Sequence, residues 1–118
     1  MSFYWKRVKK MKVNEYIEKL SLEVVSKGDL EKEIKGCYCS DLLSHCMSNI
    51  DEGNVWITVQ TNINIVAIAV LTELSCIVVA QGMTVEEPVI QKAVSEGITI
   101  LRSNEAAYEL CVKTGNAI

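Results

Sequence analysis

Polar residues with short side chains follow four apolar segments of the sequence, and they are the residues best suited to bind a ligand. If the apolar segments are parallel strands, these residues gather at the carboxyl edge of one sheet, where open α/β sheets bind their ligands. Helix N-termini at that edge offer free N–H groups and partial positive charge. The pattern predicts binding of a nucleotide-like or anionic small molecule, although the same residue types also cap helices. The candidate ligand-binding residues are Ser40, Asp41, Gln60, Thr61, Asn62, Gln81, Gly82, Ser103 and Asn104.

Catalytic groups are not evident among these residues. The sequence contains neither G-x-x-x-x-G-K-[ST] nor G-x-G-x-x-G, two common phosphate-binding loops. His45 is the single histidine, and its neighbour Cys46 would face another direction on a helix. A nucleophile needs a base within hydrogen-bonding distance, so this pair does not predict an enzyme. We therefore expect a non-catalytic regulatory or ligand-sensing module.

Four soft ligands lie close together in the sequence as C-x-C-x₅-H-C, formed by Cys37, Cys39, His45 and Cys46. Such residues can hold zinc or an iron–sulfur centre, but this spacing is not one of the usual ones. The five cysteines are an odd number and no secretion signal is evident, which favours reduced, small buried thiols. We expect no metal and no cofactor, and a cysteine-based metal or redox protein is the second alternative.

Strands alternate with helices in the predicted fold. Strand-like segments occur at 33–39, 55–59, 76–79 and 98–101. Helices are expected at 14–20 with Asn14 as N-cap, after Ser40 to about residue 49, from a T-x-x-E capping box at Thr84 to Gly97, and from Ser103 to Gly115. This order predicts an α/β fold with a small open, mostly parallel sheet of 4–5 strands and helices on its faces. The N-terminal part, with a short apolar run at 23–25, should add an edge.

The segment 61–74 is almost continuously apolar, and its length favours a helix over a strand. A helix that is apolar all round must be buried on more than one side. The N-terminal helix could cover it, or a second subunit could, and the second case predicts a homodimer.

Composition excludes several classes of protein. The 118 residues suit one domain, and the net charge of −3 gives no reason to expect nucleic-acid binding. The first ten residues carry Lys6, Arg7, Lys9 and Lys10 and no acid, a charge of +4, so the remainder sums to −7. They make a poor signal peptide, and we interpret them as a flexible extension or the product of an early start codon, ahead of one domain at 11–118. The longest apolar stretch, 65–71, is too short to span a membrane, and a cytoplasmic protein is expected.

From residue 11 onward the sequence resembles the DRTGG domain family and, more loosely, the N-terminal domain of HPr kinase/phosphorylase. The matching stretches are MKVNEYIEKLSLEVV, IKGCYCSDLLS, GNVWITVQTNINIVAIAVL and CIVVAQGMTVEEPVIQKAVSEGITIL, which together cover about residues 11–114. The resemblance implies an α/β fold, frequent dimerisation and a regulatory role. Family members accompany nucleotide-sensing CBS domains in regulated pyrophosphatases or precede phosphotransacetylase domains.

The residues that give the family its name are altered here. Gln60-Thr61 stands where an Asp-Arg pair is usual, and Gln81-Gly82-Met83 stands where Thr-Gly-Gly is usual, so that Gly82 alone is kept. Loss of the arginine removes an anion clamp. The catalytic domain of HPr kinase has no counterpart in this sequence. Standalone copies occur near iron-hydrogenase and redox genes, so the first alternative is a protein-interaction or assembly subunit of redox enzymes; a partner from phosphate metabolism is also compatible.

Overall fold

The computed structural model describes residues 11–118, so the prediction made for residues 1–10 lies outside the described part of the chain. Five strands form one sheet in the order β2-β7-β6-β5-β4. The strands β4, β5, β6 and β7 are mutually parallel, and β2 pairs with β7 in the antiparallel sense at one edge. The predicted α/β fold with a mostly parallel sheet is confirmed, including the edge added by the N-terminal part. The strands are β2 (Glu23–Ser26), β4 (Gly36–Cys39), β5 (Asn54–Thr58), β6 (Cys76–Val79) and β7 (Ile100–Arg102).

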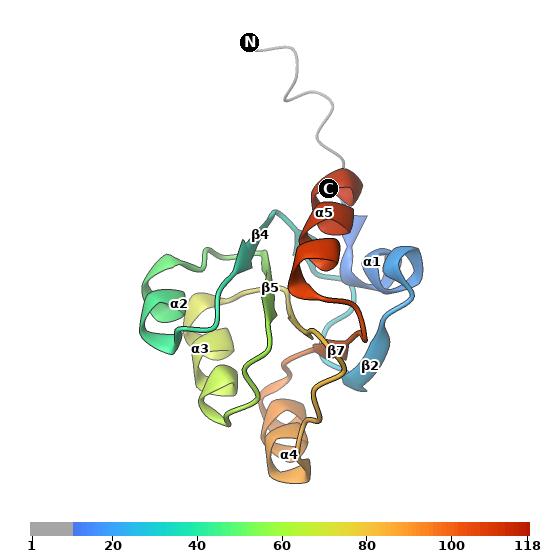
Figure 1. The fold of residues 1–118 in the computed structure, drawn as a ribbon. Coiled ribbons are helices and arrows are strands. Elements are labelled where there is room, and N and C mark those ends of the chain that lie inside the picture. Colours follow the sequence, from blue (N-terminus) through green and yellow to red (C-terminus); the bar gives the residue numbers. More distant parts are fainter. Residues whose placement is uncertain (1–10) are drawn as a thin grey trace.

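Helices cover both faces of this sheet and make three layers (Figure 1). Helices α2 (Leu43–Asn49), α3 (Asn64–Thr72) and α4 (Glu87–Glu96) pack on one face, while α1 (Val13–Leu20) and α5 (Ala107–Ala117) pack on the other. A separate two-stranded ribbon pairs β1 (Met11–Lys12) with β3 (Glu33–Ile34). Because β4 to β7 are parallel, all their carboxyl ends lie at one edge of the sheet, where the loops that could bind a ligand begin.

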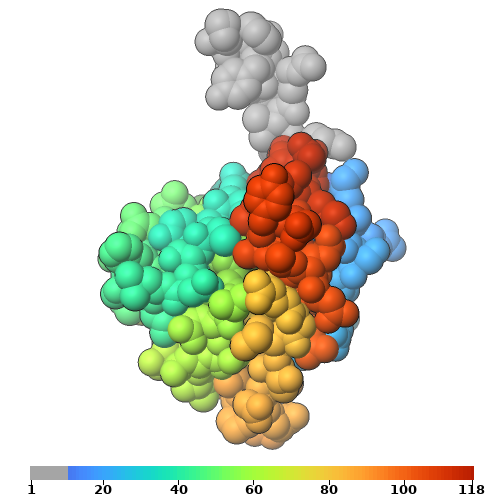
Figure 2. All heavy atoms as spheres, viewed as in Figure 1, coloured from blue at the N-terminus to red at the C-terminus, as the bar shows by residue number. Residues whose placement is uncertain are grey.

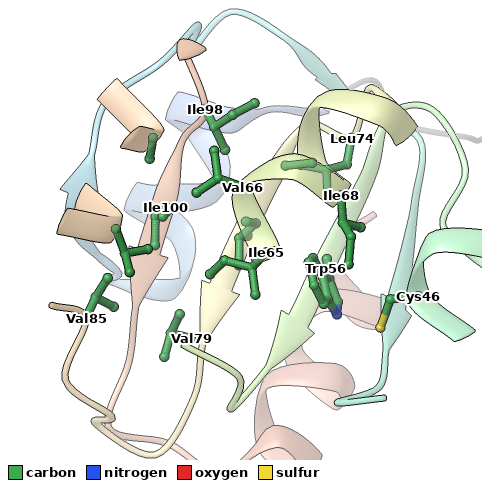
Figure 3. Packing of buried hydrophobic residues seen from close by; sticks show 14 of the residues in the cluster. Cys46, Trp56, Ile65, Val66, Ile68, Leu74, Val79, Val85, Ile98 and Ile100 are labelled. Atoms are coloured by element: carbon green, nitrogen blue, oxygen red, sulfur yellow. The ribbon is translucent and has the colours of Figure 1, made fainter. Parts of the chain in front are cut away.

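Each face of the sheet has its own apolar core. On one face Trp56 of β5 lies beside Cys46 of α2 and beneath the buried residues of α3 (Figure 3). On the other face Tyr16 of α1 is fully buried, and its hydroxyl shares a 2.7 Å hydrogen bond with Thr114 Oγ1 of α5. This bond joins the two helices that cover that face, and its two residues are 98 positions apart in the sequence.

The segment 61–74 contains a helix, as predicted, but one of the two expected coverings, by the N-terminal helix, is wrong. Helices α2 and α4 flank α3, whereas α1 lies on the opposite face of the sheet. The buried side of α3 presents Ile65, Ile68 and Ala69, while Val70 and Leu71 are exposed. The N-terminal helix therefore does not cover it, and part of its apolar surface faces solvent. None of the helices in 11–118 has the length and apolar character needed to cross a membrane.

The predicted strand at 33–39 is wrong in extent, because it is two strands in two sheets. Lys35 separates β3 from β4, and its backbone N–H donates to the Gly53 carbonyl. Alternation along the sequence continues through this break, since both pieces are extended, so the pattern alone could not show it.

The helix starts expected at Ser40, Thr84 and Ser103 are also wrong. The N-caps are Leu42, Glu86 and Ala106, and none of them caps with its side chain. The Ser40 and Ser103 hydroxyls instead accept hydrogen bonds from backbone N–H groups two residues later, so each forms a turn before its helix.

The ends of the first and last helices differ as well. The N-cap of α1 is Lys12, whose N–H donates to Glu15 Oε1 at 2.8 Å, so Asn14 lies inside the helix. Helix α5 continues through Gly115 because the last turn is anchored by the buried Thr114 and Ala117. The predicted stop at Gly97 is confirmed, since that residue ends α4 with φ +71°.

Candidate functional site

The nine predicted site residues all lie in loops that follow β4, β5, β6 and β7, at the carboxyl edge of the sheet. The hydrogen bonds divide them into two groups. One group joins the loops after β4 and β5, and the other joins the loops after β6 and β7. Each group belongs to a pair of neighbouring strands, β4 with β5 and β6 with β7.

Asp41 organises the first group. Its Oδ1 accepts hydrogen bonds from Thr58 Oγ1 at 2.7 Å and from the Val59 N–H at 2.8 Å, and its carbonyl accepts a longer bond from Gln60 Nε2. Asn62 Oδ1 accepts the N–H of Asn64 at the start of α3. The carboxylate of Asp41 thus holds the loop after β5 in place, and an acidic oxygen at this point disfavours an anionic ligand nearby.

The second group is built around a left-handed turn. Gln81 and Gly82 have φ of +62° and +64°, and their N–H groups donate to the carbonyls of Glu105 and Ser103 at 2.8 Å. A Cβ on residue 82 would meet the side chain of Asn104. Glycine is required here by both the backbone and the close approach, which gives a physical reason for Gly82.

A hollow of about 380 Å³ opens beside this second group, at the end of β7. Its size is that of the smaller ligand pockets of proteins. Two predicted residues, Ser103 and Asn104, line it, and the other seven predicted residues do not. The remaining lining residues are Lys19, Leu20, Ser21, Glu23, Arg102, Glu105 and Lys113.

Three cations and two carboxylates line this hollow, so its side chains sum to +1. Arg102 Nε lies 3.2 Å from Glu23 Oε1, and Lys113 Nζ lies 2.8 Å from Glu105 Oε1. Lys19 forms no ion pair with any residue of 11–118. Exposed pairs of this kind are weak, so an anion can compete for their cations at small cost.

The direction of β2 explains how Lys19 and Glu23 reach this edge. Because β2 runs antiparallel to β7, its first residue lies opposite the last residue of β7, and Glu23 pairs with Arg102 in the register. The α1–β2 turn, with Ser21 at φ +55°, therefore lies at the carboxyl edge of the parallel strands. Lys19 and Lys113 do not directly follow a strand, so the strand ends in the sequence do not indicate them. Recognition of the 23–25 run as an antiparallel edge would have indicated Lys19.

The cysteine cluster seen in the sequence is divided by the fold. Cys46 is buried on the α2–α3 face, His45 is exposed, and Cys37 and Cys39 lie on β4 at the sheet edge. Within 11–118 no group of three or more His, Cys, Asp or Glu side chains is placed to hold a metal. Burial raises the pKa of the Cys37 thiol to about 12 and also raises the pKa of Cys46, so these thiols stay protonated near neutral pH.

The comparison with protein families gives one match, in which the model of the DRTGG domain covers residues 15–115. The chain belongs to the DRTGG domain family. The match spans nearly all of the described residues, so the whole fold, and not one motif, carries the membership. The resemblance noted in the sequence is confirmed.

Among solved structures, the DRTGG fold of this chain is similar to one from Clostridium perfringens. It contains the CBS and DRTGG domains of the regulatory region of a pyrophosphatase, complexed with its activator, diadenosine tetraphosphate. The TM-score is 0.69 at 20% identity, with 87% of this chain covered and 46% of the other. This chain therefore corresponds to less than half of that regulatory region. No curated protein matches the chain.

Proposed function

We propose that this DRTGG domain is a non-catalytic regulatory module that senses a nucleotide-like or other anionic small molecule at the carboxyl edge of its sheet. The observation that carries the proposal is the hollow at the end of β7, where Lys19, Arg102 and Lys113 converge beside the turns at Gly82 and Ser103. Phosphate groups are recognised by arginine and lysine side chains, and both kinds of side chain line the hollow.

The Clostridium perfringens structure adds a separate argument. That regulatory region includes a DRTGG domain and responds to diadenosine tetraphosphate, which is a nucleotide and a polyanion. A DRTGG domain with a cationic hollow would suit the same class of ligand. The altered residues Gln60 and Thr61 belong to the other loop group, so their change leaves the hollow at β7 intact.

Calorimetric titration of the purified chain with AMP, diadenosine tetraphosphate and inorganic pyrophosphate tests this proposal. We expect saturable binding by at least one probe, weakened several-fold by Lys113→Gln and further weakened as KCl is raised. Lys35→Gln is a matched control, because Lys35 also pairs with a glutamate and its side chain is 53% exposed, close to the 52% of Lys113. The proposal would be contradicted if none of the three probes gave heat of binding, or if both variants lost affinity equally.

We propose further that this module acts as a homodimer, which is favoured by the apolar surface of α3 and α4. A groove of about 360 Å³ is lined by Val66, Ala67, Val70 and Leu71, with Lys92 and Glu96 beside them. Leu71 is 69% exposed, which is unusual for a leucine on a monomer surface when others adjoin it. In a two-fold arrangement with antiparallel α4 helices, Lys92 of one copy faces Glu96 of the other, so the groove complements a second copy of itself.

This homodimer is compatible with ligand sensing and is part of the same proposal. Light scattering of the wild type should give the mass of two chains, and Leu71→Glu should give the mass of one. Tyr108→Glu is the control, since Tyr108 is 74% exposed on α5, away from the groove. A wild-type protein that stays monomeric at millimolar concentration would exclude the dimer, and a monomeric Tyr108→Glu variant would move the interface elsewhere.

A further inference from the structure

Two cysteines of the edge strand β4 face α5, and α5 itself carries a third. Tyr38 of β4 packs against the core on the α2–α3 side, and strand residues alternate between faces, so Cys37 and Cys39 point to the opposite side. That side is covered by α5, which contacts β4 and carries Cys111 against the second core. Figure 2 shows α5, in red, with the teal segment that contains β4 directly beside it.

Cys39 and Cys111 are the two thiols that meet. The side chain of Cys111 lies next to that of Cys39, at the contact between β4 and α5. Cys39 is exposed on an edge strand, and Cys111 is half-buried. The other candidates are less suitable, because Cys46 lies on the far face and Cys76 is fully buried on β6, with β5 between it and β4.

We infer that Cys39 and Cys111 form a modification site, a dithiol that small-molecule disulfides such as glutathione disulfide oxidise to an intramolecular disulfide bond. The chemistry has two steps. The Cys39 thiolate attacks one sulfur of the oxidant, the oxidant's S–S bond breaks, and one glutathione leaves as a thiolate that takes up a proton. The Cys111 thiolate then attacks the Cys39 sulfur of the mixed disulfide and releases the second glutathione. Two electrons pass from the protein to the oxidant, and the two thiol protons end on the two glutathiones.

The surroundings of Cys39 affect the rate and the equilibrium differently. Partial desolvation of the sulfur by its neighbours, with Cys111 adding to the effect, raises the pKa of Cys39 to about 12. The thiolate is therefore scarce at neutral pH, which slows the first step. Because the thiolate form is disfavoured, it does not stabilise the reduced pair. A dithiol without a stabilised thiolate has a lower reduction potential, so its disulfide is harder to reduce. The site would be oxidised slowly and would then stay oxidised until a reductant acts.

The proposed bond joins the edge strand to the last helix and closes a loop of 73 residues, from Cys39 to Cys111. A crosslink of that span stabilises a fold chiefly by restricting the unfolded chain, and we expect the melting temperature to rise by roughly 10 °C. Helix α5 also carries Lys113, so oxidation fixes one wall of the hollow at β7. The inference does not depend on ligand binding at that hollow.

Incubation of the full chain with glutathione disulfide at mildly alkaline pH tests the site. After alkylation under denaturing conditions, intact mass should show a monomer with three alkylated cysteines in place of five and no bound glutathione. Trypsin leaves Cys37, Cys39, Cys46 and Cys76 in one peptide, since no lysine or arginine lies between Lys35 and Lys92, so variants must identify the pair. Cys39→Ser and Cys111→Ser should abolish the crosslinked species, whereas Cys37→Ser and Cys46→Ser should retain it.

The melting temperature provides the second readout. Wild type and Cys37→Ser should both melt higher after oxidation, and the gain should disappear when a reducing agent is added. Circular dichroism of each reduced variant shows that it is folded. The inference would be overturned by a crosslink that survives Cys39→Ser or by one that needs Cys37. It would equally be overturned by a disulfide between two chains, or by stable glutathione adducts without an intramolecular disulfide.

Discussion

The side chain of Asn104 occupies the space that any residue other than glycine would need at position 82, since a Cβ there would lie 2.6 Å from Asn104 Oδ1. The turn after β6 and the turn after β7 are thus fitted to each other. Two backbone hydrogen bonds, from Gln81 and Gly82, reinforce the contact.

Gly82→Ala should therefore destabilise the fold by about 1–3 kcal/mol, from the left-handed backbone and the contact with Asn104 together. Gly97→Ala separates the two causes, because Gly97 has φ +71° and nothing within 4 Å of its Cβ position. Urea unfolding should show the smaller loss, about 1 kcal/mol, for Gly97→Ala. Equal losses would mean that Asn104 moves aside freely.

Asp41 is expected to act as a structural residue of the loop after β5. Asp41→Ala removes the acceptor of Thr58 Oγ1 and the Val59 N–H, and should lower the free energy of unfolding by about 1–2 kcal/mol. Asp41→Asn keeps an oxygen at the same position and should lose less. If both variants unfold like wild type but lose ligand binding, Asp41 contacts the ligand and the structural interpretation fails.

The buried bond between Tyr16 and Thr114 should couple α1 to α5. Tyr16→Phe leaves the Thr114 hydroxyl without this partner and should cost about 1–2 kcal/mol. Thr114→Val should cost a similar amount, and the double variant should cost less than the sum of the two. Additive losses in chemical unfolding would show that the two hydroxyls do not interact.

Stability should fall in alkaline solution. Burial raises the pKa of Tyr16 and of Cys76 well above their ordinary values of 10.0 and 9.0. Below those ordinary values both groups are protonated in the folded and the unfolded chain. As pH rises past 9 and then 10, the unfolded chain loses these protons while the folded chain keeps them, so ionisation favours unfolding.

Each such group should reduce the free energy of unfolding by about 1.4 kcal/mol per pH unit above its ordinary pKa. Urea titrations between pH 7 and pH 11 measure the slope, and Tyr16→Phe should flatten it above pH 10. A slope that is unchanged in Tyr16→Phe would show that this tyrosine ionises without unfolding the chain.

Much of the fold could be predicted because it depends on patterns that are local in the sequence. The alternation of 55–59, 61–74, 76–79 and 98–101 fixes a parallel sheet, since such strands need helical crossovers. The caps could not be predicted, because Ser40 and Ser103 have the same preference for a turn as for an N-cap. Choice between them depends on tertiary contacts such as Asp41 with Thr58.

The nine predicted site residues share one edge of the sheet with the hollow, but only two of them line it. Ser103 and Asn104 follow a strand directly, so strand ends indicated them. Lys19 and Lys113 come from helices that contact each other only after both have packed on the same face of the sheet. No local sequence pattern indicates that contact. The proximity of Cys39 and Cys111 was not predictable for the same reason, because 71 residues separate them in the chain.

The antiparallel direction of β2 has a consequence for synthesis of the chain. The hollow needs Lys19 from the first helix and Lys113 from the last, so its two cationic walls leave the ribosome far apart in time. The loops after β4 and β5 can assemble while translation continues, whereas the hollow cannot exist until α5 has emerged. If the hollow binds a ligand as proposed, a nascent chain could not respond to that ligand before synthesis has passed α5.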